Sequence, residues 1–133
     1  MSEKTMKADA LHNKGYNCAQ AVACTFAEEL GKSEKEVFEI MEAFGLGMGS
    51  MGTCGAVTGM AAVVGMKNSD GNLDAPGTKK SSYTQMKELN QKFVDKNGSN
   101  ICRELKGIDT GKMLRSCPGC IEDCVAILEE YLK

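Results

Sequence analysis

The sequence predicts an all-α protein, a compact single-domain bundle of about five helices. Apolar residues recur at helical spacing along most of the chain, and residues typical of helix starts and stops flank these segments. No segment alternates apolar and polar residues over the length of a strand. A chain of 133 residues suffices for one hydrophobic core, so residues 1–133 are expected to form one cysteine-rich helical domain.

The first half of the chain shows clear helix signals. Residues 1–14 are expected to form a peripheral N-terminal helix or arm. A helix is expected to begin after Asn17, a favoured N-cap, and to end at Gly31, because glycine commonly terminates helices. The next helix begins with Ser33 and Glu36, which have the spacing of a capping box.

A glycine loop at residues 45–52 leads into a helix of small residues at 53–66. Gly55 and Gly59 lie four residues apart in this helix, so another backbone or a cofactor can approach that face closely. After a loop of turn residues, three further helices are expected. They are a long amphipathic helix over 78–97, a short helix over 99–107 and a closing helix over 117–133, with Pro118 at its first position.

Composition and charge exclude several classes of function. The net charge is −2 with acids and bases interspersed, so we expect no nucleic-acid partner. The N-terminus lacks the apolar region of a signal peptide, which indicates a cytoplasmic location where thiols stay reduced. The stretch 44–66 carries no charge, but its seven glycines favour a buried helix over a membrane span. That helix would also suit packing against a second copy of the chain, and a homodimer is left open.

Four of the seven cysteines, Cys18, Cys54, Cys102 and Cys117, fall in the first turn of an expected helix. Ser99 or Asn100 would cap the helix of Cys102, and Cys117 would itself occupy the cap. Unpaired N–H groups and the helix dipole stabilise a thiolate at such positions, and the thiolate is both the nucleophile and the metal ligand. These four side chains are therefore the candidate site.

The other three cysteines are less favoured. Cys24 lies among apolar residues and is expected to be a small buried hydrophobe. Cys120 and Cys124 are four residues apart and share a helix face with Cys117, so they either join the site or line the core.

The motif Cys54-Gly55-Ala56-Val57-Thr58-Gly59, with Cys18 in "YNCAQAV", Cys102 in "SNICREL" and Cys117 in "RSCPGC", resembles the C-GCAxxG-C-C family of small bacterial proteins. That family is described as redox-active, with four hallmark cysteines. The resemblance covers about residues 15–132 and places the hallmark cysteines on the same four positions. It implies a redox function, with an iron–sulfur centre favoured because a similar cysteine region occurs in split-Soret cytochromes. The family's frequent encoding near transporters implies an accessory role as an alternative.

Three chemistries remain open for these thiols, and the sequence does not decide whether the protein is an oxidoreductase enzyme. The favoured function is electron transfer to an unknown redox partner through an iron–sulfur cluster on Cys18, Cys54, Cys102 and Cys117, with Gly55 beside it and Cys120 or Cys124 as substitute ligands. The second is thiol–disulfide exchange by Cys117 and Cys120, which form a Cys-x-x-Cys opening a helix. The third is a non-catalytic module, either zinc-stabilised or associated with a transporter.

Three further sequence features do not indicate a cofactor or ligand. The sequence lacks Cys-x-x-Cys-His, so c-type haem is not expected. His12 is expected to be exposed to solvent rather than a ligand. Residues 47–52 fit G-x-G-x-x-G, but a dinucleotide fingerprint must follow a strand, and the segment before it has the spacing of a helix.

Overall fold

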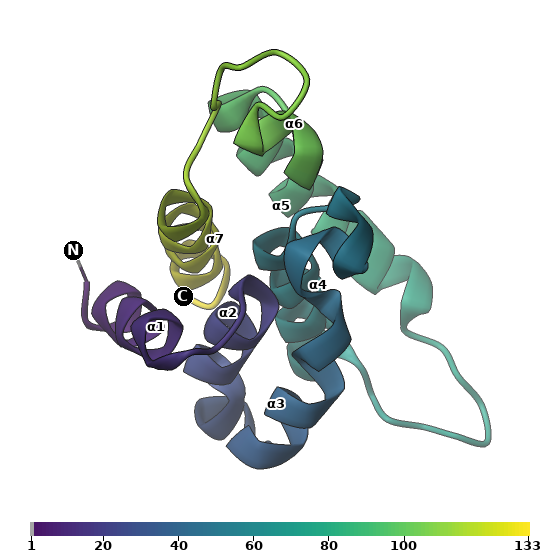
Figure 1. Ribbon diagram of the computed structural model, residues 1–133. Coiled ribbons are helices and arrows are strands. Elements are labelled where there is room, and N and C mark those ends of the chain that lie inside the picture. Colours follow the sequence, from purple (N-terminus) through teal and green to yellow (C-terminus); the bar gives the residue numbers. More distant parts are fainter. Residues whose placement is uncertain (1) are drawn as a thin grey trace.

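The computed structural model describes residues 2–133, which form seven α-helices (Figure 1). Within this range there is no β-strand, only an isolated antiparallel bridge between Thr53 and Ile101. The predicted all-α class is confirmed. The predicted number of about five helices is slightly too low; the N-terminal segment, expected to be a helix or an arm, forms a helix, and the expected short helix after Ile101 forms as well. The helices are α1 (Glu3–Lys14), α2 (Cys18–Ala27), α3 (Glu34–Met41), α4 (Gly55–Asn68), α5 (Lys79–Asn97), α6 (Cys102–Lys106) and α7 (Cys117–Tyr131).

Side-chain caps fix where several helices begin. Asn17 and Gln20 form a complete capping box at the start of α2, and Ser33 Oγ accepts the N–H of Glu36 at the start of α3. Both predicted cap residues are confirmed, each contributing about 1 kcal/mol to stability. The predicted stop at Gly31 is confirmed, because this residue has a φ value of 76° and ends its helix in the left-handed conformation, and Gly98 ends α5 in the same way with a φ value of 85°.

The core is built around α2, which contacts α1, α3, α4 and α7 (Figure 1). Every residue from Ala19 to Ala27 is buried, so this helix is covered on all sides. The largest fully buried side chains of the core include Phe26 of α2 and Met60, Phe93 and Ile121 of other helices. Burial of these apolar groups supplies most of the stabilisation of the fold.

The contact between α2 and α4 depends on glycine. A Cβ atom on Gly59 would lie 2.8 Å from the Ala19 carbonyl oxygen, and one on Gly55 would lie 3.2 Å from Cys18 Cβ. The prediction that these glycines allow another backbone to pack closely is therefore confirmed.

Among residues 2–133, no helix combines the length and the apolar composition that crossing a bilayer requires.

A buried carboxylate joins α7 to α5 and to the segment before α7. Asp123 is only 4% exposed and accepts hydrogen bonds from Arg115 Nε (3.0 Å), Asn97 Nδ2 (3.1 Å) and Lys96 Nζ. Burial opposes its ionisation, but these hydrogen bonds outweigh that effect and lower the pKa of Asp123. Gly119 leaves room for the guanidinium, since a Cβ there would lie 2.4 Å from Arg115 Nε.

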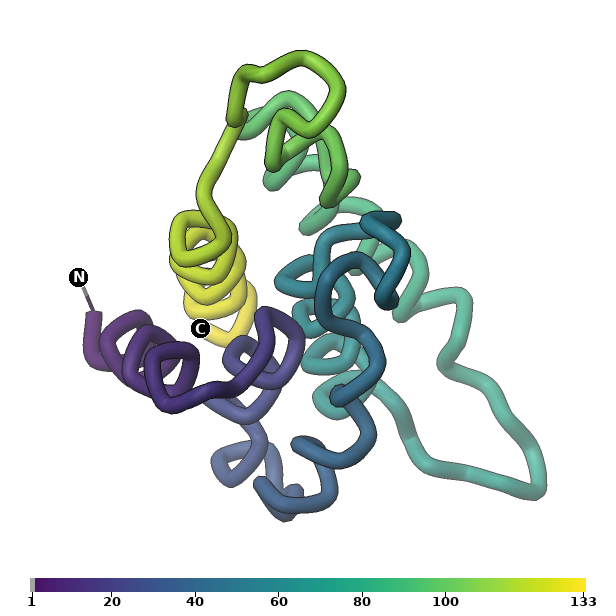
Figure 2. The backbone as a smooth tube through the Cα atoms, in the orientation of Figure 1, coloured from purple at the N-terminus to yellow at the C-terminus, as the bar shows by residue number. Residues whose placement is uncertain are grey.

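The loop between α4 and α5, residues 69–78, projects from the helices (Figure 2). Its conformation comes from local turns, in which Asp70 Oδ1 accepts the N–H of Asn72, and Asn72 Oδ1 accepts those of Asp74 and Ala75. Leu73 is 93% exposed. The loop therefore holds its shape without a contribution from the core.

We expect Gly59→Ala to destabilise the protein by about 1–3 kcal/mol, because the added methyl group would press on the backbone of α2. Gly65→Ala is the matched control, since a Cβ at this position in the same helix meets nothing within 4 Å. It should stabilise the protein by about 0.5–1 kcal/mol through its better helix propensity. Urea unfolding of the reduced protein, followed by circular dichroism, measures both. Equal effects of the two substitutions would contradict the close contact.

Candidate functional site

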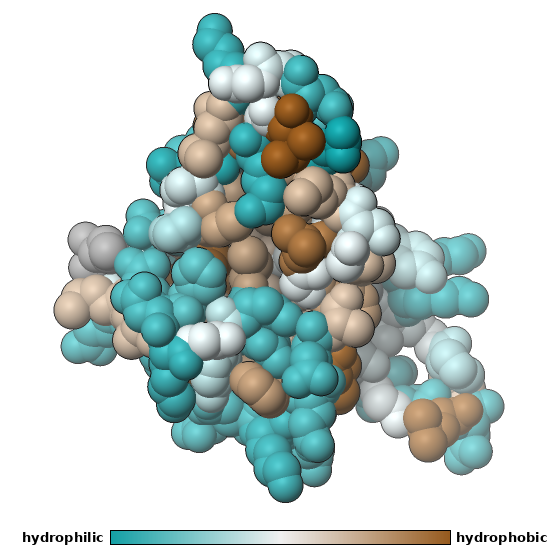
Figure 3. Space-filling model, in the orientation of Figure 1, coloured by the Kyte–Doolittle hydropathy of each residue, from teal (hydrophilic) through white to brown (hydrophobic). Residues whose placement is uncertain are grey.

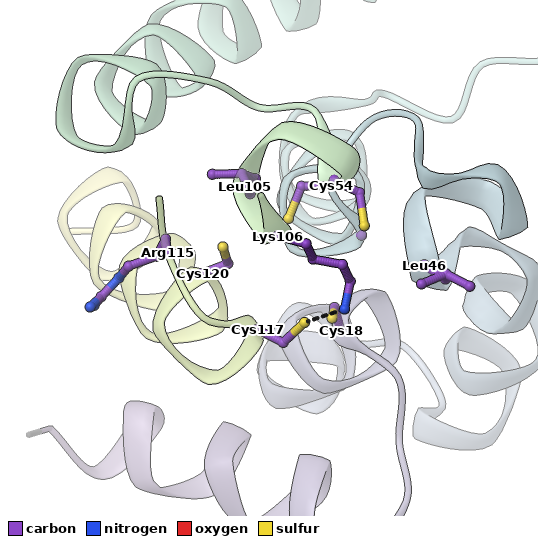
Figure 4. A pocket seen from close by; sticks show the side chains of 10 residues that line it. Cys18, Leu46, Cys54, Leu105, Lys106, Arg115, Cys117 and Cys120 are labelled. Carbon is purple, nitrogen blue, oxygen red and sulfur yellow. Dashed lines mark hydrogen bonds between the residues drawn. The ribbon is translucent and has the colours of Figure 1, made fainter. Parts of the chain in front are cut away.

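Five of the seven cysteines line one small cavity of about 80 Å³ (Figure 4). They come from four helices that are far apart in the sequence. All four cysteines selected from the sequence are in this set, and Cys120 is the fifth. The complete lining is Cys18, Leu46, Cys54, Gly55, Cys102, Leu105, Lys106, Arg115, Cys117 and Cys120.

Each of the four predicted cysteines lies at the beginning of a helix. Cys18, Cys102 and Cys117 are the first residues of α2, α6 and α7, and Cys54 is the N-cap of α4. The prediction that Cys117 occupies the cap of its helix is wrong by one residue, because Ser116 Oγ accepts the N–H of Gly119 and caps α7.

The predicted caps of α6 are also wrong. Ile101 occupies the N-cap position, while Ser99 Oγ accepts the N–H of Ile101 instead.

Two backbone hydrogen bonds hold Cys54 and Cys102 side by side. The N–H of Cys54 donates to the carbonyl of Asn100 at 2.7 Å, and the N–H of Cys102 donates to the carbonyl of Gly52 at 2.6 Å. The short bridge at Thr53 and Ile101 thereby aligns the starts of α4 and α6.

The glycine segment before Cys54 forms a left-handed turn rather than an open loop. Leu46, Gly47, Met48 and Gly49 have φ values between 53° and 74°. A Cβ on Gly47 would lie 2.3 Å from the Gly52 nitrogen, so only glycine fits there. Left-handed conformations are costly for other residue types and tend to occur at functional sites. The segment follows helical structure and not a strand, so it lacks the context of a dinucleotide-binding loop.

The thiols of Cys18 and Cys117 interact across the interface of α2 and α7. This interaction lowers the pKa of Cys117 to about 5, burial opposes the shift, and the positive charge of Lys106 adds to it. The same interaction, together with burial, raises the pKa of Cys18.

A second pair joins α4 and α7, where the thiol of Cys54 interacts with that of Cys120. This interaction lowers the pKa of Cys54 to about 7, against the effect of burial, and the backbone N–H groups of Val57 and Ala56 add to the lowering. The pKa of Cys120 is raised by the interaction with Cys54 and by burial. For Cys102, burial raises the pKa of the thiol.

Lys106 is the cation of the site. Its Nζ lies 3.5 Å from Cys117 Sγ, and Figure 4 shows its side chain reaching across the cavity toward Cys117 and Cys18. The thiolate of Cys117 raises the pKa of Lys106 in turn. Arg115 also lines the cavity, but its guanidinium points away from the thiols and binds Asp123.

Sequence reasoning missed Lys106, although a signal was present. Lys106 lies four residues after Cys102 in α6, and residues at that spacing share a helix face. The sequence also gave no indication that Leu46 would border the cavity, because its position depends on the left-handed turn. His12, expected to be exposed to solvent rather than a ligand, is half-buried on α1 and does not line the cavity.

Cys24 and Cys124 do not line the cavity. Cys24 is fully buried, with its thiol 3.7 Å from the carbonyl oxygen of Glu34, and burial raises its pKa to about 11. Cys124 is fully buried in the core, where burial raises its pKa strongly. Among residues 2–133, no three side chains of His, Cys, Asp or Glu are arranged to hold a single metal ion.

Apolar side chains are exposed near two of the helices that contribute thiols to the cavity. Figure 3 shows apolar side chains gathered where α4 and α6 begin, with hydrophilic side chains below them. Large apolar side chains are exposed on the left-handed turn and on the segment between α6 and α7. They are Leu46, Met48, Ile108, Met113 and Leu114.

A comparison with protein families assigns the chain. The family described as "Putative redox-active protein (C_GCAxxG_C_C)" matches residues 16–131, a range that contains all seven cysteines. The chain belongs to the C-GCAxxG-C-C family. The resemblance found in the sequence is therefore confirmed, and the family description supports a redox class of function. Comparison of this family member with curated proteins and with solved structures gives no match.

We expect Lys106→Met to raise the pKa of Cys117, because the thiolate loses its nearby positive charge. A rise of about one unit would slow alkylation of Cys117 at pH 5 about fivefold, since less of the thiol would be ionised below its pKa. The measurement is the rate of iodoacetamide labelling at Cys117 from pH 4 to pH 9, in reduced, metal-free protein. Lys112→Met is the matched control, because Lys112 is exposed and does not line the cavity. An unchanged pH profile for Lys106→Met would contradict the assigned role.

Proposed function

We propose that the protein transfers electrons through an iron–sulfur cluster held by Cys18, Cys54, Cys102 and Cys117. The observation that carries the proposal is the convergence of these four thiols on one cavity from the first turns of four helices. Family membership supports the redox class but does not identify the cofactor.

The chemistry of the donor set fits a cluster. Iron–sulfur clusters in proteins are bound mainly by cysteine thiolates, usually four of them. A cluster distributes its ligands over several iron atoms, so thiols spaced around a cavity suit it better than thiols that meet at one point. Cys120 also borders the cavity and is the candidate substitute ligand, whereas Cys124 lies in the core behind it.

The electrostatic surroundings of the thiols also support the proposal. A cluster with four thiolate ligands is an anion, and its burial requires compensating positive charge. Lys106 supplies a full charge next to Cys117, and the backbone N–H groups of Ala56 and Val57 favour the thiolate of Cys54. Such polar groups around metal ligands tune their redox potential.

When bound, the cluster would supply one-electron redox chemistry that the side chains lack. The chain's own residues have three tasks. The cysteines bind, Lys106 balances charge, and Leu46 and Leu105 shield the cavity from water. Leu46 lines the cavity and is exposed, and such an apolar side chain suits a transient contact with a redox partner protein.

We expect protein purified without oxygen to be brown and to contain two or four iron atoms with matching labile sulfide. Cys54→Ser and Cys102→Ser should each lose most of the visible absorbance, because each removes a proposed ligand. Cys24→Ser is the matched control, since Cys24 is buried away from the cavity, and it should keep the absorbance. The measurements are the visible spectrum and the iron, sulfide and zinc contents.

Protein that stays colourless after anaerobic purification and after reconstitution with iron and sulfide would contradict the proposal. Zinc as the sole bound metal would instead favour the structural module. A metal-free protein with titratable dithiols would favour thiol–disulfide exchange.

A further inference from the structure

The thiols of the cavity form two pairs, and each pair joins α7 to a different helix. Figure 4 shows the sulfurs of Cys117 and Cys18 next to each other beside Lys106, and Cys120, one turn later in α7, lines the same cavity as Cys54 at the start of α4. The helix pairs α2–α7 and α4–α7 are in contact, which brings each of these thiol pairs to a packed interface beside the cavity. Cys102 borders the same cavity without such a partner on α7.

We infer that the metal-free protein is a two-step dithiol reductant of low-molecular-weight disulfides, forming the disulfides Cys18–Cys117 and Cys54–Cys120 in that order. Neither disulfide requires the proposed cluster to exist, so this inference does not rest on the proposed function. On this inference, Cys117 and Cys120 of the Cys-x-x-Cys each bond to a cysteine of another helix rather than to each other.

Glutathione disulfide is the oxidant for the formation of each protein disulfide. The sulfur of Cys117 attacks one glutathione sulfur, a mixed disulfide forms, and the first glutathione thiolate leaves. The thiol of Cys18 loses its proton and its sulfur attacks the Cys117 sulfur, forming Cys18–Cys117 and releasing the second glutathione thiolate. Two electrons pass from the two cysteines to the glutathione disulfide. Cys120 and Cys54 react in the same way with a second molecule.

Access from solvent decides the order in which the two disulfides form, and the positions of the thiols decide which of them pair. Cys18 and Cys117 are half-buried, whereas Cys54 and Cys120 are buried, so a disulfide from solution reaches the first pair more easily. Lys106 also attracts an anionic substrate such as glutathione disulfide to Cys117. A bond between Cys117 and Cys120 would have to form within α7, whereas the proposed bonds link α7 to the helices packed against it.

The two disulfides would also change what the site can bind. Together they consume three of the four proposed cluster ligands, Cys18, Cys54 and Cys117, and leave Cys102 free. The oxidised chain therefore cannot hold a four-thiolate cluster until a reductant opens both bonds. Oxidation would thus act as a reversible block on loading of the site.

The test is to treat reduced, chelator-treated protein with glutathione disulfide and to map disulfides over time by mass spectrometry after alkylation of free thiols. We expect Cys18–Cys117 to appear first and Cys54–Cys120 second, with two glutathione molecules released per bond. Cys24, Cys102 and Cys124 should be alkylated. A predominant Cys117–Cys120 bond, a bond to Cys102, or stable mixed disulfides alone would overturn the inference.

The tryptic peptide beginning at Ser116 contains Cys117, Cys120 and Cys124 together, so the peptide masses alone do not show which of them is bonded. Variants that lack single cysteines resolve this. Cys120→Ser should keep the first disulfide and lose the second, and Cys117→Ser should show the reverse. Cys24→Ser removes the other cysteine from the peptide of Cys18 and should form both bonds. The assay uses no iron, so failure to bind a cluster and failure to form these disulfides are separate results.

Discussion

The close contact between α2 and α4 is the constraint on which both the core and the thiol site depend. Gly59 lets the two backbones approach, and Gly55 brings the start of α4 against Cys18. The same contact places Cys54 near the start of α2, so the packing that buries the core also assembles half of the site. A larger side chain at either glycine would separate the helices and the thiols together.

Helix α7 completes the site from the other side, and a charged network holds its first turns in place. Arg115 crosses Gly119 to reach the buried carboxylate of Asp123, which Lys96 and Asn97 also bind. Removing one partner from such a buried network leaves an uncompensated charge, which is strongly destabilising. The glycine between the two cysteines of the Cys-x-x-Cys therefore serves the docking of α7 rather than the reactivity of its thiols.

Local signals made much of this structure predictable. Caps and stops such as Asn17 and Gly98 act within a few residues, so the sequence shows them directly, and small residues in α4 indicated close packing. The left-handed turn was not predictable, because non-glycine residues such as Leu46 adopt it only when tertiary contacts enforce it. The convergence of thiols depends on helix docking. First-turn positions select the candidate cysteines, but spacing in the chain does not reveal that Cys120 faces α4.

The exposed loop at residues 69–78 divides the chain into two parts that each bring thiols to the cavity. Cys18 and Cys54 precede it, whereas Cys102, Cys117 and Cys120 follow it. Loops of this kind are the usual sites of proteolytic cleavage. A chain cut there would become two fragments that each carry thiols of the cavity and that pack together through the interfaces of α7 with α2 and α4. The protein is thus a natural candidate for fragment complementation, with the site itself reporting reassembly.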